Sequence, residues 1–230
     1  MAAQEAGHDV RSAEGRVAGR ATALGRYRAL REARPEMFAG GGPVVIVDPE
    51  ANPHAGVVYA DPWIMLVVDA VRLPDGRPGS YTRLQYATGT REGVAVLPVT
   101  ATGVVLLKHW RHATQRWHLE IPRGFGEPDV SPADQAAAEL LEETGLVADI
   151  EPLGMLHPDS GTLSFEVALH LAFVRPGQTP AAREGLASIV EMTFAEFERA
   201  IASGDVSDSF TIAAWARYAL TGRRGALERS

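Results

Sequence analysis

The chain has 230 residues, 46% of them hydrophobic and 22% charged, so it is long enough to bury a full hydrophobic core. It contains no cysteine, which excludes disulfide bonds and thiolate zinc sites, and its net charge of −7 argues against nonspecific nucleic-acid binding. No apolar run approaches the ~18–20 residues that cross a bilayer, and the first residues lack a secretory signal pattern. These features predict a cytoplasmic protein without a membrane or nucleic-acid partner.

The N-terminal part of the chain predicts a tail followed by a helix. Residues 1–15 are polar, and we expect them to form a disordered tail. In residues 16–33 apolar side chains recur at helical spacing among basic ones, and Pro35 ends the predicted helix. Such a helix can lie on a membrane surface, but its acidic residues and weak hydrophobicity favour packing on the protein.

Three apolar segments then predict the strands of a small antiparallel sheet. They are VVIVDP at 44–49, VVYADPWIMLVVDAVRL at 57–73 and SYTRLQYATG at 80–89. Turn residues at 74–76 join the last two segments as a hairpin. We expect residues 16–90 to form this helix-and-sheet domain and residues 91–225 to form a second domain.

A basic segment follows the first hairpin of the second domain. Apolar runs at 94–97 and 104–107, separated by a TATG turn, predict that hairpin. The next stretch, KHWRHATQRWHLEIPRG, has three histidines and four cations: Lys108, Arg111, Arg116 and Arg123. Because the planar fork of arginine suits contacts to oxyanions, this segment predicts a phosphate-binding surface. We expect its histidines at the surface or rim rather than as ligands.

An acid-rich segment comes next. Between Arg123 and Arg175 the sequence has ten acidic residues and no lysine or arginine. Ser131 is a good N-cap, proline suits the first helical position, and Gly145 suits a left-handed C-terminal residue, so the sequence predicts a helix over Pro132–Thr144. A folded chain that concentrates like charge in this way needs a cation to neutralise it.

Three glutamates near the end of this helix predict a metal site. Glu139, Glu142 and Glu143 are spaced i, i+3, i+4 and share one helical face. Their repulsion costs a few tenths of a kcal/mol per pair, and the negative end of the helix dipole adds roughly 0.3–1 kcal/mol each. A solvated face, the alternative, would place basic residues among them. Hard divalent cations such as Mg²⁺ take carboxylate oxygens and substrate phosphates, which fits this arrangement.

These residues resemble the Nudix box, G-x5-E-x7-R-E-U-x-E-E-x-G-U, where U is a bulky apolar residue. Gly124 and residues 139–146 fit its register without a gap, while Val130 and Ala138 stand where the box has glutamate and arginine. The resemblance implies an α/β protein with the Nudix α/β/α sandwich and a mixed sheet. The basic helix and the small antiparallel sheet would precede that sandwich.

The basic segment carries a second resemblance, to the ADP-ribose pyrophosphatases and related nucleotide-sugar hydrolases of this family. Trp110 and Arg111 are similar to the end of an L-x-x-Q-Y-R element, and residues 117–124 resemble a W-x-x-E-L-P-A-G element. A small N-terminal antiparallel sheet is typical of this subgroup, in which it helps to build a homodimer and part of the substrate pocket. The resemblance therefore implies a homodimer.

The resemblance also implies a metal site and a reaction. Glu139, Glu142 and Glu143 would bind Mg²⁺ or Mn²⁺, with the backbone carbonyl of Arg123 or Gly124 as a further ligand. Glu142 and Glu143 are also candidates for catalytic residues. The substrate would be a nucleoside diphosphate linked to another moiety, with ADP-ribose or a nucleotide sugar favoured. Water would attack one phosphorus of its pyrophosphate.

Other residues are candidates for binding the substrate. Arg111 and Arg123 are the candidates for contacts to the diphosphate. Trp110 or Trp117 could stack on the base, and packing in the core is the alternative for each tryptophan.

Two glutamates further along the chain are candidates for the general base. Glu166 follows a loop at 156–161 that is similar to the S-P-G loop of the family. Glu184 lies in the loop RPGQTPAAREG, roughly where ADP-ribose pyrophosphatases carry a catalytic glutamate on a mobile loop. A solvated surface side chain is the alternative for each.

Two other functions stay open at this point. Ala138 replaces the arginine that orients the glutamates in the family, so the chain could be a Nudix-fold regulatory module that binds a nucleotide without turnover. A hydrolase for a dinucleotide polyphosphate or for coenzyme A is a further possibility.

Overall fold

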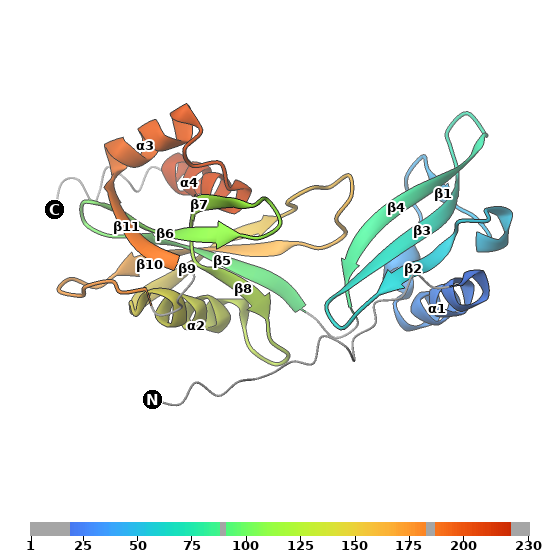
Figure 1. Cartoon of the computed structure of the whole chain (residues 1–230), viewed down its shortest axis with the longest axis horizontal. Helices are drawn as coiled ribbons and strands as arrows, with labels where there is room; N and C mark the ends of the chain where they lie inside the picture. Colours follow the sequence, from blue (N-terminus) through green and yellow to red (C-terminus); the bar gives the residue numbers. More distant parts are fainter. Residues whose placement is uncertain (1–18, 88–90, 183–186, 222–230) are drawn as a thin grey trace. The chain divides into compact units, whose positions relative to one another are not determined.

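The computed structural model describes residues 19–87, 91–182 and 187–221, and the chain divides into two compact units. The first unit comprises Met1–Gly89 together with Asp159–Phe165, and the second comprises Thr90–Pro158 and Glu166–Ser230 (Figure 1). The chain therefore passes between the units three times. The tail expected at residues 1–15 lies outside the described residues.

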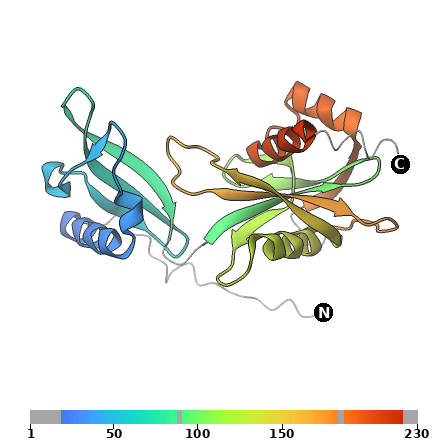
Figure 2. The ribbon, with the colours of Figure 1, turned by 180° about the vertical axis from the view of Figure 1, so that it is seen from behind.

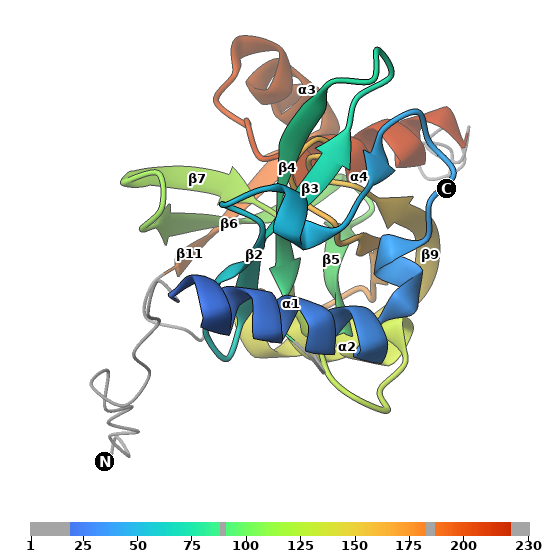
Figure 3. The same cartoon turned by 90° about the vertical axis from the view of Figure 1, so that its right-hand side faces the viewer.

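The first unit is a small antiparallel sheet with a helix on one face. Its elements are α1 (Arg20–Ala33), η1 (Pro35–Phe38), β1 (Val45–Ile46), η2 (Pro49–Ala51), β2 (Gly56–Ala60), β3 (Ile64–Arg72) and β4 (Pro78–Tyr86). Strand β3 is central and pairs antiparallel with β1, β2 and β4. Helix α1 runs across one face of the sheet (Figure 3), so the predicted basic helix packs on the protein.

A buried charged network joins α1 to this sheet. Asp69 on β3 is 2% exposed and accepts a hydrogen bond of 2.6 Å from the hydroxyl of Tyr27. The same carboxylate accepts bonds of 2.6 and 3.2 Å from Nε and Nη2 of Arg83. Nη1 of Arg83 donates to the carbonyl of Met37, and the guanidinium lies 4.9 Å from the centre of the Phe38 ring. The buried carboxylate is thus paired and hydrogen-bonded, as a buried charge must be.

The segment Asp159–Phe165 lies along the edge of β4. The backbone N–H of Leu84 donates to the carbonyl of Thr162 at 2.8 Å, and Leu84 and Leu163 form a parallel bridge. The ring of Phe165 stacks on that of Tyr86, with 4.1 Å between their centres. The connection between two strands of the second unit is therefore built into the sheet of the first.

The second unit is a three-layer α/β/α sandwich. Its elements are β5 (Arg91–Val99), β6 (Gly103–Arg111), β7 (Arg116–Glu120), β8 (Arg123–Gly126), α2 (Pro132–Thr144), β9 (Ala148–Leu156), β10 (Val167–Val174), β11 (Ala187–Thr193), α3 (Phe194–Ser203) and α4 (Ser209–Leu220). The sheet has the order β11-β6-β5-β10-β9, with β7 beside β6 and β8 beside β5. Strands β5 and β10 are parallel and the other pairs antiparallel, so the predicted mixed sheet is confirmed.

Each face of this sheet buries its own apolar core. On β5, Ala95 and Leu97 face the core beneath α3 and α4, whereas Val94 and Val96 face the core beneath α2. Figures 1 and 2 show α2 on one side of the sheet and α3 and α4 on the other. A strand covered on both faces has apolar residues at successive positions, which explains the continuous apolar run of β5.

Helix α2 has the limits that its capping residues predict. The hydroxyl of Ser131 accepts a hydrogen bond from the backbone N–H of Asp134 at 3.1 Å, and the helix spans Pro132–Thr144. Gly145 ends it with a left-handed φ of 73°, a conformation that costs glycine little. The limits of the helix therefore depend on Ser131 and Gly145 and not on its glutamates.

No helix in the described ranges combines the length and the apolar character needed to cross a membrane.

Candidate active site

The site begins where strand β8 passes the last turns of α2. Gly124 on β8 lies against the carboxylate of Glu139, so closely that a Cβ at Gly124 would overlap that group. The carboxylate also accepts a hydrogen bond of 2.9 Å from the amide of Gln135, one turn earlier on α2. A side chain at this point of β8 would displace the carboxylate of Glu139, so glycine allows that carboxylate to lie beside the strand.

A second glutamate of α2 contacts the same stretch of β8. Glu143 is 9% exposed, and its Oε2 accepts a hydrogen bond of 3.1 Å from the backbone N–H of Arg123. Glu142 is exposed. The structure thus places Glu139 and Glu143 against the beginning of β8 and Glu142 toward solvent.

The donor groups at this position suit a hard divalent cation. No three acidic or histidine side chains in the described parts of the chain are gathered closely enough to hold a metal ion. Magnesium, however, is commonly bound through one or two carboxylates, with water and substrate phosphates as its other ligands. Carboxylates held against the β8 backbone by a glycine contact and an N–H bond fit that mode of binding.

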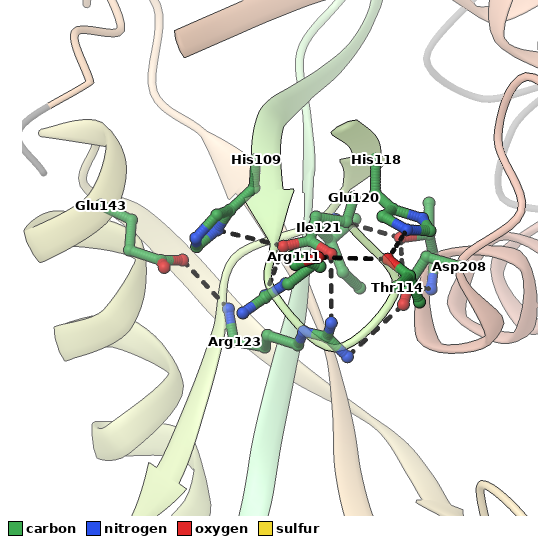
Figure 4. Close-up of polar contacts among 10 residues, drawn as sticks. His109, Arg111, Thr114, His118, Glu120, Ile121, Arg123, Glu143 and Asp208 are labelled. Atoms are coloured by element: carbon green, nitrogen blue, oxygen red, sulfur yellow. Dashed lines mark hydrogen bonds and ion pairs between the residues drawn. The ribbon is translucent and has the colours of Figure 1, made fainter. Parts of the chain in front are cut away.

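A buried carboxylate organises the basic segment. The antiparallel register of β6 and β7 pairs Glu120 with Leu107, so Glu120 lies on the same face of the sheet as His109 and Arg111, and it is 1% exposed (Figure 4). Arg111 contacts it with two nitrogens: Nε donates a hydrogen bond of 3.1 Å to Oε2, and Nη2 forms an ion pair with Oε1. Nη2 of Arg123 lies 3.1 Å from Oε2, and Nδ1 of His109 lies 3.2 Å from Oε1 without hydrogen-bond alignment. Cations therefore compensate the buried charge.

The side chain of Arg123 also reaches the start of α4. Its Nη1 lies 3.4 Å from Oδ1 of Asp208, and its guanidinium lies 4.7 Å from the ring centre of Phe210. Asp208 is the N-cap of α4 and accepts from the backbone N–H of Thr211. The hydroxyl of Thr211 in turn accepts a hydrogen bond of 3.0 Å from the backbone N–H of Ile121. Figure 4 shows this network between α2 and the start of α4.

The other candidates for substrate contacts lie on the β6–β7 hairpin. The hydrogen bond and the ion pair that Arg111 makes with Glu120 use Nε and Nη2, so the Nη1 end of its guanidinium is the part that can face a ligand. Trp117 is 54% exposed and meets Trp110 edge to face at 5.6 Å. The ammonium of Lys108 lies 5.8 Å from the Trp117 ring centre. Packing in the core, the alternative for each tryptophan, does not apply to Trp117.

Sequence reasoning missed the role of Glu120 and misplaced one histidine. The side chain of His109, expected at the surface or rim, is only 12% exposed and contacts Glu120. The signal that could have revealed Glu120 is an acidic residue between the apolar Leu119 and Ile121, in the element that resembles W-x-x-E-L-P-A-G. An acid at such a position needs buried cations, and the same segment supplies them.

Of the two candidate general bases, Glu166 contacts a histidine. Oε1 of Glu166 lies 2.9 Å from Nε2 of His157, and the Glu166 side chain is 40% exposed. Glu166 directly follows the Asp159–Phe165 segment that belongs to the first unit. Glu184 lies outside the described residues.

Comparison with known protein families identifies the second unit. The model of the NUDIX domain matches residues 89–210, which are more than half of the 230 residues. The chain belongs to the NUDIX family. A second model, the nucleoside diphosphate sugar hydrolase N-terminal domain, matches residues 57–84 of this NUDIX protein, which contain most of β2, β3 and β4.

Individual proteins resemble this NUDIX chain over different lengths. The ADP-ribose pyrophosphatase of Bacillus subtilis (strain 168) is 34% identical over 92 residues, which cover 40% of this chain and 48% of that protein. The chain thus matches about half the length of this curated relative. A solved structure of an "ADP compounds hydrolase" has a TM-score of 0.61 and 18% identity, covering 80% of this chain and 94% of the other. That likeness shows the fold, and the predicted Nudix sandwich is confirmed.

Proposed function

We propose that this protein hydrolyses the pyrophosphate of a nucleoside diphosphate linked to another moiety, with ADP-ribose or a nucleotide sugar favoured. The observation that carries the proposal is the arrangement around Arg123. On one side its backbone holds Glu143, and on the other its side chain joins the cationic cluster around Glu120 (Figure 4). Hydrolysis of a diphosphate requires both an acidic metal platform and basic groups for the phosphates.

The relatives support the choice of substrate. One is an ADP-ribose pyrophosphatase and another is an ADP compounds hydrolase. The N-terminal match is to a domain of nucleoside diphosphate sugar hydrolases. All three descriptions concern a nucleoside diphosphate or a sugar joined to one, which is the substrate class proposed here.

The acidic side of the site would hold Mg²⁺ or Mn²⁺. Glu139, Glu142 and Glu143 would be its carboxylate ligands, with the backbone carbonyl of Arg123 as a further ligand. When bound, such an ion neutralises the diphosphate, lowers the pKa of a bound water and stabilises the leaving oxygen. Gly124 leaves room for the carboxylate of Glu139 beside β8, so glycine there would keep the ligands close to the backbone carbonyl.

The chain's own residues would bind the substrate and move the proton. Arg111, held on two nitrogens by Glu120, would contact the diphosphate oxygens, and Trp117 would stack on the base. Water attacks one phosphorus, the bridging P–O bond breaks, and the products are a nucleoside monophosphate and a phosphorylated remainder. The proton lost by the attacking water passes to a carboxylate, for which Glu166 and Glu184 are the candidates.

A homodimer is part of the proposal. The N-terminal match to the nucleoside diphosphate sugar hydrolase domain supports it, because the resemblance implies that this sheet serves dimerisation. Sedimentation of the purified protein would give the mass directly, and a monomer at assay concentrations would remove this part of the proposal.

A second candidate is a NUDIX module that binds nucleotides without turnover. Two observations favour it, namely Ala138 at the arginine position of the box and the outward placement of Glu142. Against it, the chain retains all three glutamates despite their mutual repulsion at the end of a helix.

One experiment separates the two functions. The protein is incubated with Mg²⁺ or Mn²⁺ and ADP-ribose, ADP-glucose, GDP-mannose, NADH, diadenosine polyphosphates and coenzyme A, and the products are identified by chromatography. We expect turnover of ADP-ribose or a nucleotide sugar, lost in Glu143→Gln and retained in Glu191→Gln, which alters an exposed glutamate on β11. Nucleotide binding without any turnover would establish the regulatory module instead.

A further inference from the structure

We propose that the side chain of Arg123 is a positioning residue for the metal site and not a contact to the substrate. This inference rests on the proposed function. The guanidinium would hold the backbone of residues 123 and 124 in place by bridging Glu120 and Asp208. The role replaces the diphosphate contact that the sequence suggests for this side chain.

The guanidinium of Arg123 is engaged on its two terminal nitrogens and on one face. Nη2 lies 3.1 Å from Glu120 Oε2, and Nη1 lies 3.4 Å from Asp208 Oδ1. The ring of Phe210 lies beneath the guanidinium at 4.7 Å. The side chains of Glu120 and Asp208 are 1% and 8% exposed, so a phosphate that took Arg123 would leave buried carboxylates less compensated. Arg111, by contrast, contacts Glu120 and no second carboxylate among the described residues.

The backbone of Arg123 and its neighbour carries the two inward-facing glutamates. The N–H of Arg123 donates to Glu143, and the carboxylate of Glu139 rests against Gly124. The side chain and the backbone share one Cα atom, so contacts that hold the guanidinium at both ends restrict the movement of that N–H. A shift on the order of 1 Å at such a point can reduce turnover by roughly 100-fold.

Helix α4 contacts the segment from Ile121 to Gly124 at a second point. The N–H of Ile121 donates to the hydroxyl of Thr211, and that hydroxyl also donates to Asp208 at 2.8 Å. The start of α4 therefore holds both residue 121 and residue 123. Where the element resembling W-x-x-E-L-P-A-G has alanine, this chain has Arg123. Any residue at this position supplies the backbone carbonyl, so the arginine side chain adds a tether, a contact that alanine would not make.

A double-mutant cycle tests the tether. Arg123→Ala removes the guanidinium and keeps the backbone carbonyl, while Asp208→Asn removes the charge and keeps an oxygen that can cap α4. Binding of Mn²⁺ alone is measured by calorimetry, and kcat and KM are measured with ADP-ribose. We expect Arg123→Ala to weaken Mn²⁺ binding about tenfold, as changes next to a metal ligand do. Asp208→Asn should act in the same direction, the double variant should be no worse than Arg123→Ala, and KM should change less than about twofold.

The exposed pair Arg175–Asp149 is the matched control. Its side chains are 60% and 72% exposed, and the same substitutions there, Arg175→Ala and Asp149→Asn, change the same charges on β9 and directly after β10. These variants should leave Mn²⁺ binding unchanged. Arg123→Ala takes one of two arginines from the buried Glu120, so its folding is checked by circular dichroism. Asp208→Asn tests the same tether with both arginines kept.

The outcomes separate this proposal from the proposed function. Wild-type turnover with a KM that rises tenfold or more in Arg123→Ala, at unchanged Mn²⁺ binding, would make Arg123 a substrate contact and overturn the proposal. Additive effects of Arg123→Ala and Asp208→Asn would overturn the bridge between them. A wild-type protein that turns over none of the tested compounds overturns the proposed function itself.

Discussion

Gly124 and Glu139 lie in direct contact, with the α-carbon of the glycine against the carboxylate of the glutamate. They are 15 residues apart in the sequence, on a strand and on the helix that follows it. The contact leaves no room for a Cβ on Gly124. A glycine on a strand therefore determines where a charged side chain of α2 can lie.

Gly124→Ala should impair turnover more than stability. The added methyl group meets the end of a flexible side chain, so Glu139 can swing aside at a cost of roughly 1–2 kcal/mol in the free energy of unfolding. The displaced carboxylate should reduce kcat by on the order of 100-fold. Gly25→Ala in α1, where a Cβ meets nothing within 4 Å, should leave kcat unchanged. Normal turnover in Gly124→Ala would mean that Glu139 is not needed beside β8.

Metal binding should stabilise the folded protein. A ligand that binds only the folded state at 100 times its dissociation constant contributes about 2.7 kcal/mol. Calorimetric melting with and without Mg²⁺ should show a higher Tm with the ion in the wild-type protein and no change in Glu139→Gln. A rise of equal size in both proteins would place the ion elsewhere. Chelation should abolish turnover and restore the lower Tm.

Glu120→Gln should reduce both stability and turnover. The glutamine keeps the shape of Glu120 but removes the charge that faces Arg111, Arg123 and His109. Both arginines keep partial access to water, so we expect a loss of about 2 kcal/mol rather than the larger penalty of a fully buried unpaired charge. Urea unfolding measures the loss. The charge change Glu191→Gln on the surface should have no effect, and an equal loss there would contradict a specific role for Glu120.

Tyr27→Phe tests the buried network of the first unit. The hydroxyl donates to the buried carboxylate of Asp69 at 2.6 Å, and a hydrogen bond to a charged group contributes roughly 1.5–3 kcal/mol. Removing it should lower the free energy of unfolding by about that amount. Tyr81→Phe makes the same change at an exposed hydroxyl that donates to the Gly161 carbonyl at 2.7 Å, and its effect should be smaller. Equal effects would argue against a special contribution of the charged acceptor.

The protein should lose stability in mild acid through His170. This side chain on β10 is 3% exposed, and burial lowers its pKa in the folded state. The unfolded chain takes up a proton near the ordinary value of ~6.5, so it binds more protons than the folded state below that pH. The free energy of unfolding should therefore fall as the pH drops below ~6.5, by up to about 1.4 kcal/mol per pH unit.

His170→Leu is the variant that isolates this effect. The free energy of unfolding, measured with denaturant between pH 5 and 7, should fall less steeply with decreasing pH in His170→Leu than in the wild-type protein. His54→Gln, at an exposed position in the first unit, should keep the wild-type slope. If His170→Leu keeps it as well, other groups cause the loss of stability.

Local patterns made part of the site predictable. Ser131 and Gly145 set the limits of α2, and the spacing of the glutamates put them on one face of that helix. The role of Glu120 was not predictable in the same way. Its contact with Arg111 depends on the register of β6 against β7, and its contact with Arg123 depends on the turn into β8. Neither follows from periodicity along one strand.

The sequence by itself determined helix α2 with its caps, the β3–β4 and β5–β6 hairpins, and the NUDIX glutamates, because these depend on residues within a few positions of one another. Only the tertiary structure decided where charges meet. It directed the Arg123 side chain to Asp208, 85 residues away, and joined Asp159–Phe165 to the sheet of the first unit. Such pairings arise when distant segments are buried together, since a charge removed from water must find its counterpart in space.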